Sequence, residues 1–190
     1  MKSPRLAVIN PKKSQRGVAA VEFALAGVVF FLLLLSAIEF GRLLYVWNTV
    51  QEVTRNAARQ AVVTDFTDTA AIAAIQRSAV FRLDDGPLPA SSEITNARVN
   101  IRYLNALGNE PTPTPSSPGD NIAACIDASR VASCIRFVEV CVSTGTTCQT
   151  GQSIPFQPMI GLFSAFTTDL KIPLSTVRMP AESLGFRPST

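Results

Sequence analysis

The stretch RGVAAVE at residues 16–22 opens directly onto FALAGVVFFLLLLSAI at residues 23–38, sixteen residues without a formal charge. Counted from Val18 to Ile38, the apolar run is 21 residues long and is interrupted only by Glu22. A helix needs about 20 apolar residues to cross the hydrocarbon core of a bilayer. The sequence therefore predicts a transmembrane helix with an acidic residue near one end.

The distribution of charge orients this helix. Five Lys or Arg residues and no acidic residue precede Val18, so the formal net charge of +3 divides into +5 on residues 1–17 and −2 (12 basic minus 14 acidic) on the rest. By the positive-inside rule, residues 1–17 stay in the cytoplasm and the chain after about Glu39 is exported. Dispersed positive charges beside a span are more typical of a topology signal than of a nucleic-acid site. We therefore expect membrane lipid as a partner and no nucleic acid.

A secretory signal peptide is the competing interpretation, because it also has a basic region followed by an apolar one. The apolar run is longer than the roughly 7–15 residues of a usual signal-peptide core. Residues 39–45 (EFGRLLY) follow it, where a signal peptide would have an Ala-x-Ala cleavage site. We therefore expect the helix to remain in the membrane, with Tyr45 and Trp47 at its outer interface.

Glu22 needs an explanation, because a formal charge at the centre of a span costs about 2.5–3.5 kcal/mol on insertion scales and less near an end. In one interpretation its carboxylate lies shallow and reaches cytoplasmic water. In the other, cleavage after Gly17 would free the amine of Val18, four residues before Glu22 on the same helix. An ammonium from the same subunit or a neighbouring one would then lie near the carboxylate.

Three stretches within about residues 14–63 carry a family resemblance: residues 16–25 (RGVAAVEFAL), 38–48 (IEFGRLLYVWN) and 51–59 (QEVTRNAAR). They resemble the TadE-like pseudopilins of the tight-adherence (Tad, Flp-type) pilus system. The resemblance implies that a prepilin peptidase cuts after Gly17, that Val18 becomes the mature N-terminus, and that Glu22 at the fifth mature position is part of the signal.

The same resemblance implies a minor or accessory pilin, or pseudopilin, that acts in pilus assembly and surface adherence. Its partners would be the prepilin peptidase, other Tad pilins and assembly-platform proteins. It would be a single-pass protein of the bacterial inner membrane, with a cytoplasmic N-terminus, a periplasmic C-terminal domain and an association with the pilus.

An apolar stripe continues beyond the span. Val46, Val50, Val53, Ala57 and Ala61 recur at spacings of four, three, four and four, which is typical of one face of a helix that leaves the membrane. The stripe would pack on this protein's own exported domain or on other subunits, and both interpretations stay open. On the opposite, solvated side we expect weak pairs three residues apart, Glu39 with Arg42 and Glu52 with Arg55.

The remaining chain reads as one small α+β domain with a second helix and an antiparallel sheet. Asp68 or Thr69 can cap the second helix, which ends at Gly86-Pro87 and has one apolar face, made of Ile72, Ile75, Ala79 and Leu83. Strands are predicted over residues 97–104, 135–144 and 170–179. Pro173 favours an edge position for the last of them, because proline has no N–H to donate to a neighbouring strand. Residues 110–120 read as a loop, and residues 153–168 as a short apolar helix around residues 159–166.

The four cysteines, Cys125, Cys134, Cys141 and Cys148, all lie in the exported half. In an oxidising compartment they indicate disulfides, with three possible connectivities. A two-residue hairpin at Thr144-Gly145 would place Cys141 opposite Cys148, which leaves Cys125 to pair with Cys134. A zinc site is the alternative, but the spacings lack a close Cys-x2-4-Cys pair.

The chain has no histidine, which excludes Ser-His-Asp and Cys-His nucleophiles and His-ligated catalytic metals. No pair among the remaining carboxylates, lysines and serines is marked out by spacing. We therefore expect no enzyme, no cofactor and no metal. An uncleaved, membrane-tethered periplasmic binding or envelope protein is the alternative function, and a tethered enzyme has only weak candidate residues.

The sequence thus predicts an α+β protein in which a long N-terminal transmembrane helix extends into the periplasm and precedes a small disulfide-containing domain. Its predicted divisions are a basic cytoplasmic leader at residues 1–17, a transmembrane and extended helix at residues 18–65, and an exported α+β domain at residues 66–190.

Overall fold

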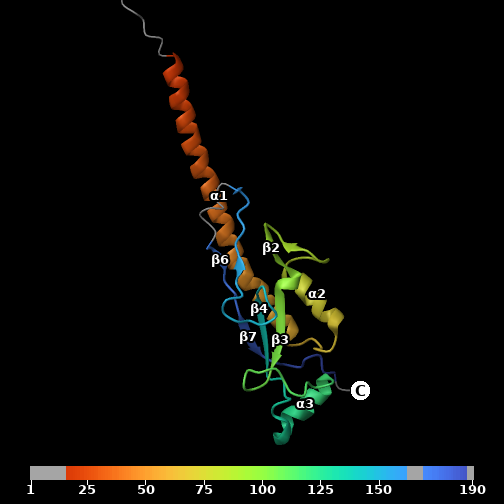
Figure 1. Cartoon of the computed structure of the whole chain (residues 1–190). Coiled ribbons are helices and arrows are strands. Elements are labelled where there is room, and N and C mark those ends of the chain that lie inside the picture. Colours follow the sequence, from red (N-terminus) through yellow and green to blue (C-terminus); the bar gives the residue numbers. More distant parts are fainter. Residues whose placement is uncertain (1–15, 162–168, 188–190) are drawn as a thin grey trace, which may run out of the picture. The chain divides into compact units, whose positions relative to one another are not determined.

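The computed structural model describes residues 16–161 and 169–187 and begins with the long helix α1, Arg16–Ala61 (Figure 1). The chain divides into two compact units, residues 1–40 (unit 1) and residues 41–190 (unit 2). Within the described residues the long apolar helix is followed by further helices, antiparallel sheets and two disulfides, so the predicted α+β class is confirmed. The three-part division into leader, helix and domain stays a prediction.

Unit 2 holds the second part of α1 and all other elements. Its helices are α2 (Thr69–Ala79) and α3 (Pro118–Ile126), with 3₁₀ turns η1 (Asn96–Arg98) and η2 (Ala128–Arg130). Its strands are β1 (Pro87–Leu88), β2 (Ser91–Thr95), β3 (Val99–Leu104), β4 (Phe137–Val142), β5 (Ile154–Pro155), β6 (Lys171–Ile172) and β7 (Val177–Pro180). They form an antiparallel sheet in the order β3-β4-β7 and two antiparallel pairs, β1-β2 and β5-β6.

The central strand β4 separates a core face from a charged face because side chains alternate along a strand. Val138, Val140 and Val142 are buried and share one apolar cluster with the residues of α1 that lie in unit 2. On the other face, the Glu139 carboxylate pairs with Arg102 at 3.0 Å and with Arg178 at 3.4 Å. The core of unit 2 therefore lies between the sheet and α1.

Helix α2 begins as predicted and ends earlier. The Asp68 carboxylate accepts the Ala71 N–H at 3.0 Å and so caps the first turn, while Ile75 and Ala79 are buried. The helix ends at Ala79, and Phe81 then takes a φ of +59°. That left-handed residue turns the chain away, so the prediction that Leu83 continues the buried face is wrong, since Leu83 is 94% exposed.

The strands predicted over residues 97–104 and 135–144 are present as the shorter β3 and β4, and residues 97–98 belong to η1 instead. The single strand predicted over residues 170–179 is two strands, β6 and β7, because Pro173 has no N–H to continue a ladder. The loop predicted over residues 110–120 gives way to α3 at Pro118. Residues 153–161 include strand β5, and the predicted helix around residues 159–166 falls mostly outside the described residues.

The C-terminal segment closes over the end of α1. The backbone N–H groups of Glu182 and Leu184 both donate to the Val62 carbonyl, at 3.2 and 3.1 Å. Leu184 is 1% exposed and belongs to the core cluster. These bonds satisfy a carbonyl at the helix terminus that has no partner within the helix. The C-terminal segment is thus part of the fold of unit 2.

The ionised Asp120 carboxylate contributes to the start of helix α3. The Ser116 N–H and the Arg130 guanidinium, at 2.9 and 2.8 Å, hold the pKa of Asp120 below its ordinary value. A lowered folded-state pKa adds stability that is complete above the unfolded pKa of about 4 and is lost as the pH falls through the folded-state pKa.

We therefore expect acid to weaken the start of α3 locally as the pH is lowered below about 4. Amide chemical shifts of residues 116, 117 and 119–121, followed by NMR against pH, measure this effect. Asp120→Asn should abolish the dependence, whereas Asp84→Asn, at an exposed carboxylate outside α3, should leave it intact. A pH profile unchanged by Asp120→Asn would contradict the assignment.

Candidate processing and assembly site

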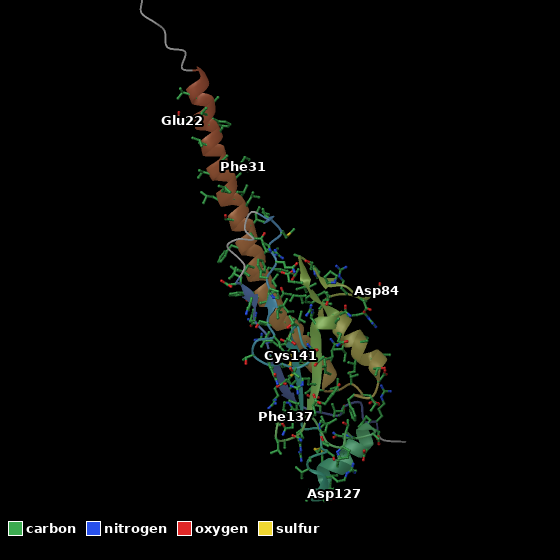
Figure 2. All side chains as sticks on the ribbon, in the orientation of Figure 1. Glu22, Phe31, Asp84, Asp127, Phe137 and Cys141 are labelled. Atoms are coloured by element: carbon green, nitrogen blue, oxygen red, sulfur yellow. A yellow bond between two sulfur atoms is a disulfide. The ribbon has the colours of Figure 1, made fainter. Side chains whose placement is uncertain are left out.

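The predicted processing junction lies in the first turns of α1. The helix begins at Arg16, so Gly17 and Val18 are already helical. Val18 and Glu22 are one turn apart and therefore lie on the same side of the helix, and both are exposed in unit 1. Figure 2 shows Glu22 on this part of the helix. Among the described residues Glu22 forms no ion pair.

The segment after the junction presents apolar side chains on all sides. In the part of the chain that the structure describes, α1 is the one helix long and apolar enough to cross a membrane, and its most apolar window is not buried within the protein. Phe23, Leu33 and Phe31 are 81%, 68% and 58% exposed, and Figure 2 marks Phe31 on this stretch. A helix that is apolar all round suits a lipid environment or the interior of an assembly. This helix is therefore a candidate membrane span.

A shallow apolar groove runs along this segment in unit 1. Gly27 lies at its middle, and a Cβ added there would meet no atom within 4 Å. The groove is lined by Phe23, Ala24, Gly27, Val28, Phe31, Leu32 and Leu35. The lack of a side chain at Gly27 lets another helix approach the backbone closely.

The apolar stripe predicted beyond the span is confirmed, and it packs inside unit 2. Val46, Val50, Val53, Ala57 and Ala61 are each 0% exposed and belong to the core cluster. Of the two interpretations left open by the sequence, packing on the protein's own domain is therefore the one that holds for these turns. The stripe is not available to a neighbouring subunit while unit 2 is folded.

The flanking residues differ from expectation at three positions. Glu52 and Arg55 form the predicted surface pair at 3.7 Å. Arg42, however, has an 8% exposed side chain and lies among the residues of unit 2. Glu39 is only 6% exposed, so the predicted place of both residues on a solvated surface is wrong. Trp47 packs against the core cluster, while Tyr45 remains exposed.

Arg42 connects α1 to two segments of unit 2. Its guanidinium lies 3.6 Å from the Glu93 carboxylate on β2, whose side chain is 2% exposed. It donates to the carbonyls of Ala90 and Gln157 and lies 4.3 Å from the ring centroid of Phe156. A buried carboxylate is tolerated only with such a partner. We call these residues (Arg42, Ala90, Glu93, Phe156 and Gln157) the Arg42 clamp.

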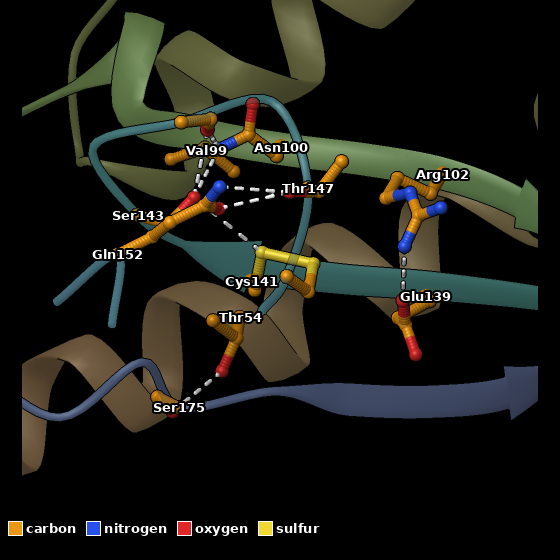
Figure 3. Close-up of a disulfide and its surroundings, with 12 residues drawn as sticks. Thr54, Val99, Asn100, Arg102, Glu139, Cys141, Ser143, Thr147, Gln152 and Ser175 are labelled. Atoms are coloured by element: carbon orange, nitrogen blue, oxygen red, sulfur yellow. Dashed lines mark hydrogen bonds and ion pairs between the residues drawn. A yellow bond between two sulfur atoms is a disulfide. The ribbon is translucent and has the colours of Figure 1, made fainter. Parts of the chain in front are cut away.

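Both disulfides lie in unit 2. Cys125 bonds to Cys134, and Cys141 bonds to Cys148, the same two pairs that the hairpin argument favoured. The two-residue hairpin itself is absent from the described loop: Thr144 N–H donates to the Gln152 carbonyl at 2.9 Å, so the loop is wider. Figure 3 shows the Cys141 disulfide beside Asn100, whose amide donates to Ser143 and to the Gly145 carbonyl.

Polar contacts also link α1 to the segment before β7. The Thr54 and Ser175 hydroxyls are 3.0 Å apart (Figure 3), and Thr54 is fully buried on α1. Sequence reasoning missed this contact and the Arg42 clamp, because their partners lie far along the chain. It also missed α3, for which a signal was present: Ser117 followed by Pro118 is a typical helix start.

The predicted site residues are thus not gathered in one place. Gly17, Val18 and Glu22 lie in unit 1, and the four cysteines lie in unit 2. Among the described residues no group of three or more Cys, Asp or Glu side chains could hold a metal ion.

These features define a protein with one candidate membrane span and a small, disulfide-braced α+β domain. Residues 17–59 match the model of a family described as TadE-like protein, so the resemblance is confirmed over that segment. The matched segment lies wholly on α1 and covers less than a quarter of the chain. No match to the chain is found among curated proteins or among solved structures.

Proposed function

We propose that this protein is a TadE-like minor pilin that a prepilin peptidase cleaves after Gly17 and that joins or primes a Tad pilus through its N-terminal helix. The observation that carries the proposal is the position of the family match, which begins at Gly17 itself and runs along α1 to residue 59. Gly17, Val18 and Glu22 act as substrate positions for the peptidase and have no catalytic role.

The charge at the junction supports the same proposal. Cleavage of the peptide bond between Gly17 and Val18 removes the basic leader and leaves an ammonium on Val18, one turn from Glu22. A carboxylate near the end of a span is costly without a cation. The ammonium of the same or a neighbouring subunit would neutralise it, so that a subunit enters the assembly with this charge paired.

The burial pattern of α1 assigns the two parts of the helix different tasks. The buried stripe of residues 46–61 holds unit 2 together, so assembly contacts are assigned to the exposed apolar residues 18–38. Packing there depends on close approach of backbones, for which the groove at Gly27 is suited. The other Tad pilins and assembly-platform proteins are the proposed partners, and surface adherence is the proposed outcome.

The first test is the mature N-terminus of the protein from a host with its own prepilin peptidase, measured by mass spectrometry. We expect a chain that begins at Val18 and lies in the inner membrane with unit 2 in the periplasm. Gly17→Leu should block cleavage, while Gly27→Ala, at another unobstructed glycine of the same helix, should not. A chain that keeps residues 1–17 would replace the proposal with an uncleaved, membrane-tethered envelope protein.

The second test concerns Glu22. We expect Glu22→Ala to lower incorporation into pili about tenfold or more, because an unpaired ammonium within the bilayer costs roughly 2 kcal/mol and 1.4 kcal/mol is a factor of ten. Immunoblots of sheared pili measure incorporation. Glu52→Ala, at a carboxylate 65% exposed on the same helix, is the control and should assemble normally. Normal entry of the Glu22→Ala protein into pili would sink the proposed role.

A further inference from the structure

The connection between β3 and β4 carries an exposed run of threonine and proline. Residues 111–118 read PTPTPSSP and precede α3. Pro111 and Pro115 are buried, whereas Thr112, Pro113 and Thr114 between them are exposed. The run is anchored at Thr112, whose N–H donates to the Ala132 carbonyl at 3.1 Å. The two buried prolines thus hold a short bridge that presents two threonine side chains to solvent.

The hydroxyls in this run fall into two groups. The Ser117 hydroxyl accepts the Asp120 N–H at 3.1 Å and caps α3, and the Ser116 hydroxyl donates to the Asp120 carboxylate at 3.3 Å. The Thr112 and Thr114 hydroxyls donate only to carbonyls of their own loop, at 3.4 and 3.2 Å. Within the described residues no group donates a hydrogen bond to the hydroxyl oxygen of either threonine. Their lone pairs remain open for reaction.

The backbone of this run is also accessible to a modifying enzyme. Segments rich in Pro with Ser or Thr have the composition typical of O-glycosylated stretches. An exposed backbone that takes part in no helix or sheet can enter the active site of a transferase without unfolding its domain. Residues 112–114 have neither helix nor strand structure, and Pro111 and Pro115 on either side of them are buried.

We propose that Thr112 and Thr114 are acceptor sites for O-linked glycosylation. The threonine Oγ1 forms a bond to the anomeric carbon of a sugar carried on a lipid phosphate, the bond from that carbon to the phosphate oxygen breaks, and the phosphate leaves with the electron pair. The hydroxyl proton goes to a base of the transferase. The inference rests on the proposed export of unit 2, where such lipid-linked donors are used.

The position of the loop allows a glycan without loss of the fold. Figure 1 shows α3, which follows directly on the run, at the end of unit 2 opposite β2 and β6. The Arg42 clamp involves β2 and residues 156–157, so a sugar on Thr112 or Thr114 would not contact it. Neither threonine belongs to the core cluster. The modification would therefore add hydrophilic bulk at one end of unit 2 only.

The test is intact-mass analysis and peptide mapping of the full chain purified from its own host under non-reducing conditions. We expect a mass above that of the mature sequence by a whole number of monosaccharide residues, located on Thr112 and Thr114 by electron-transfer fragmentation. The double variant T112V/T114V keeps the β-branched shape and should lose all of this mass. T146V, at an exposed threonine in the loop of the second disulfide, should retain it.

The cysteines in the same sample separate the two proposals. Linked Cys125–Cys134 and Cys141–Cys148 with unmodified threonines would overturn the glycosylation and leave export standing. Four free thiols with unmodified threonines would overturn both. A glycan that persists in T112V/T114V, at Ser116 for example, would also overturn the assignment to the two threonines.

Discussion

Replacing Arg42 with Met destabilises unit 2 by about 3–5 kcal/mol, the usual cost of removing one partner from a buried ion pair. The Glu93 side chain is 2% exposed, so its charge would lose its cation without gaining water. The Gln157 N–H, at 3.3 Å from the same carboxylate, remains as a weak partner. Two carbonyls, of Ala90 and Gln157, would also lose their donor.

The measurement is denaturant unfolding of the detergent-solubilised full chain with both disulfides intact. Trp47 is the single tryptophan of the chain and packs against the core cluster, so its fluorescence reports the folding of unit 2. The free energy of unfolding is extrapolated from the linear dependence on denaturant.

The control for this prediction is Arg55→Met on the same helix. Arg55 is 54% exposed in its pair with Glu52, and exposed pairs contribute about 0.2–1 kcal/mol. The double variant Arg42→Met with Glu93→Leu should recover most of the lost stability, because no charge is then left buried. If Arg42→Met costs no more than Arg55→Met, the clamp does not hold unit 2 together.

Variants of the Arg42 clamp also distinguish the stability of unit 2 from the cleavage of the leader. Arg42 lies in unit 2, and Gly17 lies in unit 1. We therefore expect Arg42→Met to be cut at the same bond as the unchanged chain even though its exported domain is less stable. Loss of pilus incorporation in this variant would then be assigned to unit 2, and loss in Glu22→Ala to the membrane helix.

The sequence predicted the features that depend on local periodicity. The apolar residues from Val46 to Ala61 recur every three to four positions. A helix with that pattern buries its apolar face against another surface. Strand β3 begins with alternating apolar and polar residues, and valine recurs at every second position of β4. The pattern does not identify the partner surface, which is why packing within the domain and packing between subunits could not be separated before the structure.

Long-range contacts were beyond the sequence for a physical reason. Glu39, three residues before Arg42, suggests a local pair, whereas the contact of Arg42 with Glu93 on β2 has no such signal in the sequence. The spacing of residues along the chain does not indicate that β2 lies next to α1 in the fold. The disulfides illustrate the opposite case: the two pairs were favoured by the sequence, although the turn that motivated them is replaced by a wider loop that closes at Gln152.

Gly185→Ala is expected to destabilise unit 2 by about 2–5 kcal/mol. Gly185 has a φ of +80°, which costs a residue with a Cβ about 1–2 kcal/mol. A Cβ there would also lie 2.6 Å from the Asp65 backbone nitrogen, and forcing an atom into such a space costs about 1–3 kcal/mol. The C-terminal segment would have to move away from residues 62–65.

The matched control is Gly151→Ala. Gly151 has a φ of +101° with no atom within 4 Å of an added Cβ, so this change tests the backbone conformation without the collision. The same unfolding measurement should give a loss about 1–3 kcal/mol smaller than for Gly185→Ala. Because Glu182 and Leu184 donate to the Val62 carbonyl, hydrogen exchange of the Leu184 amide should also rise in Gly185→Ala alone. Equal losses in the two variants would show that the contact with Asp65 relaxes freely and that the C-terminal segment does not fix the end of α1.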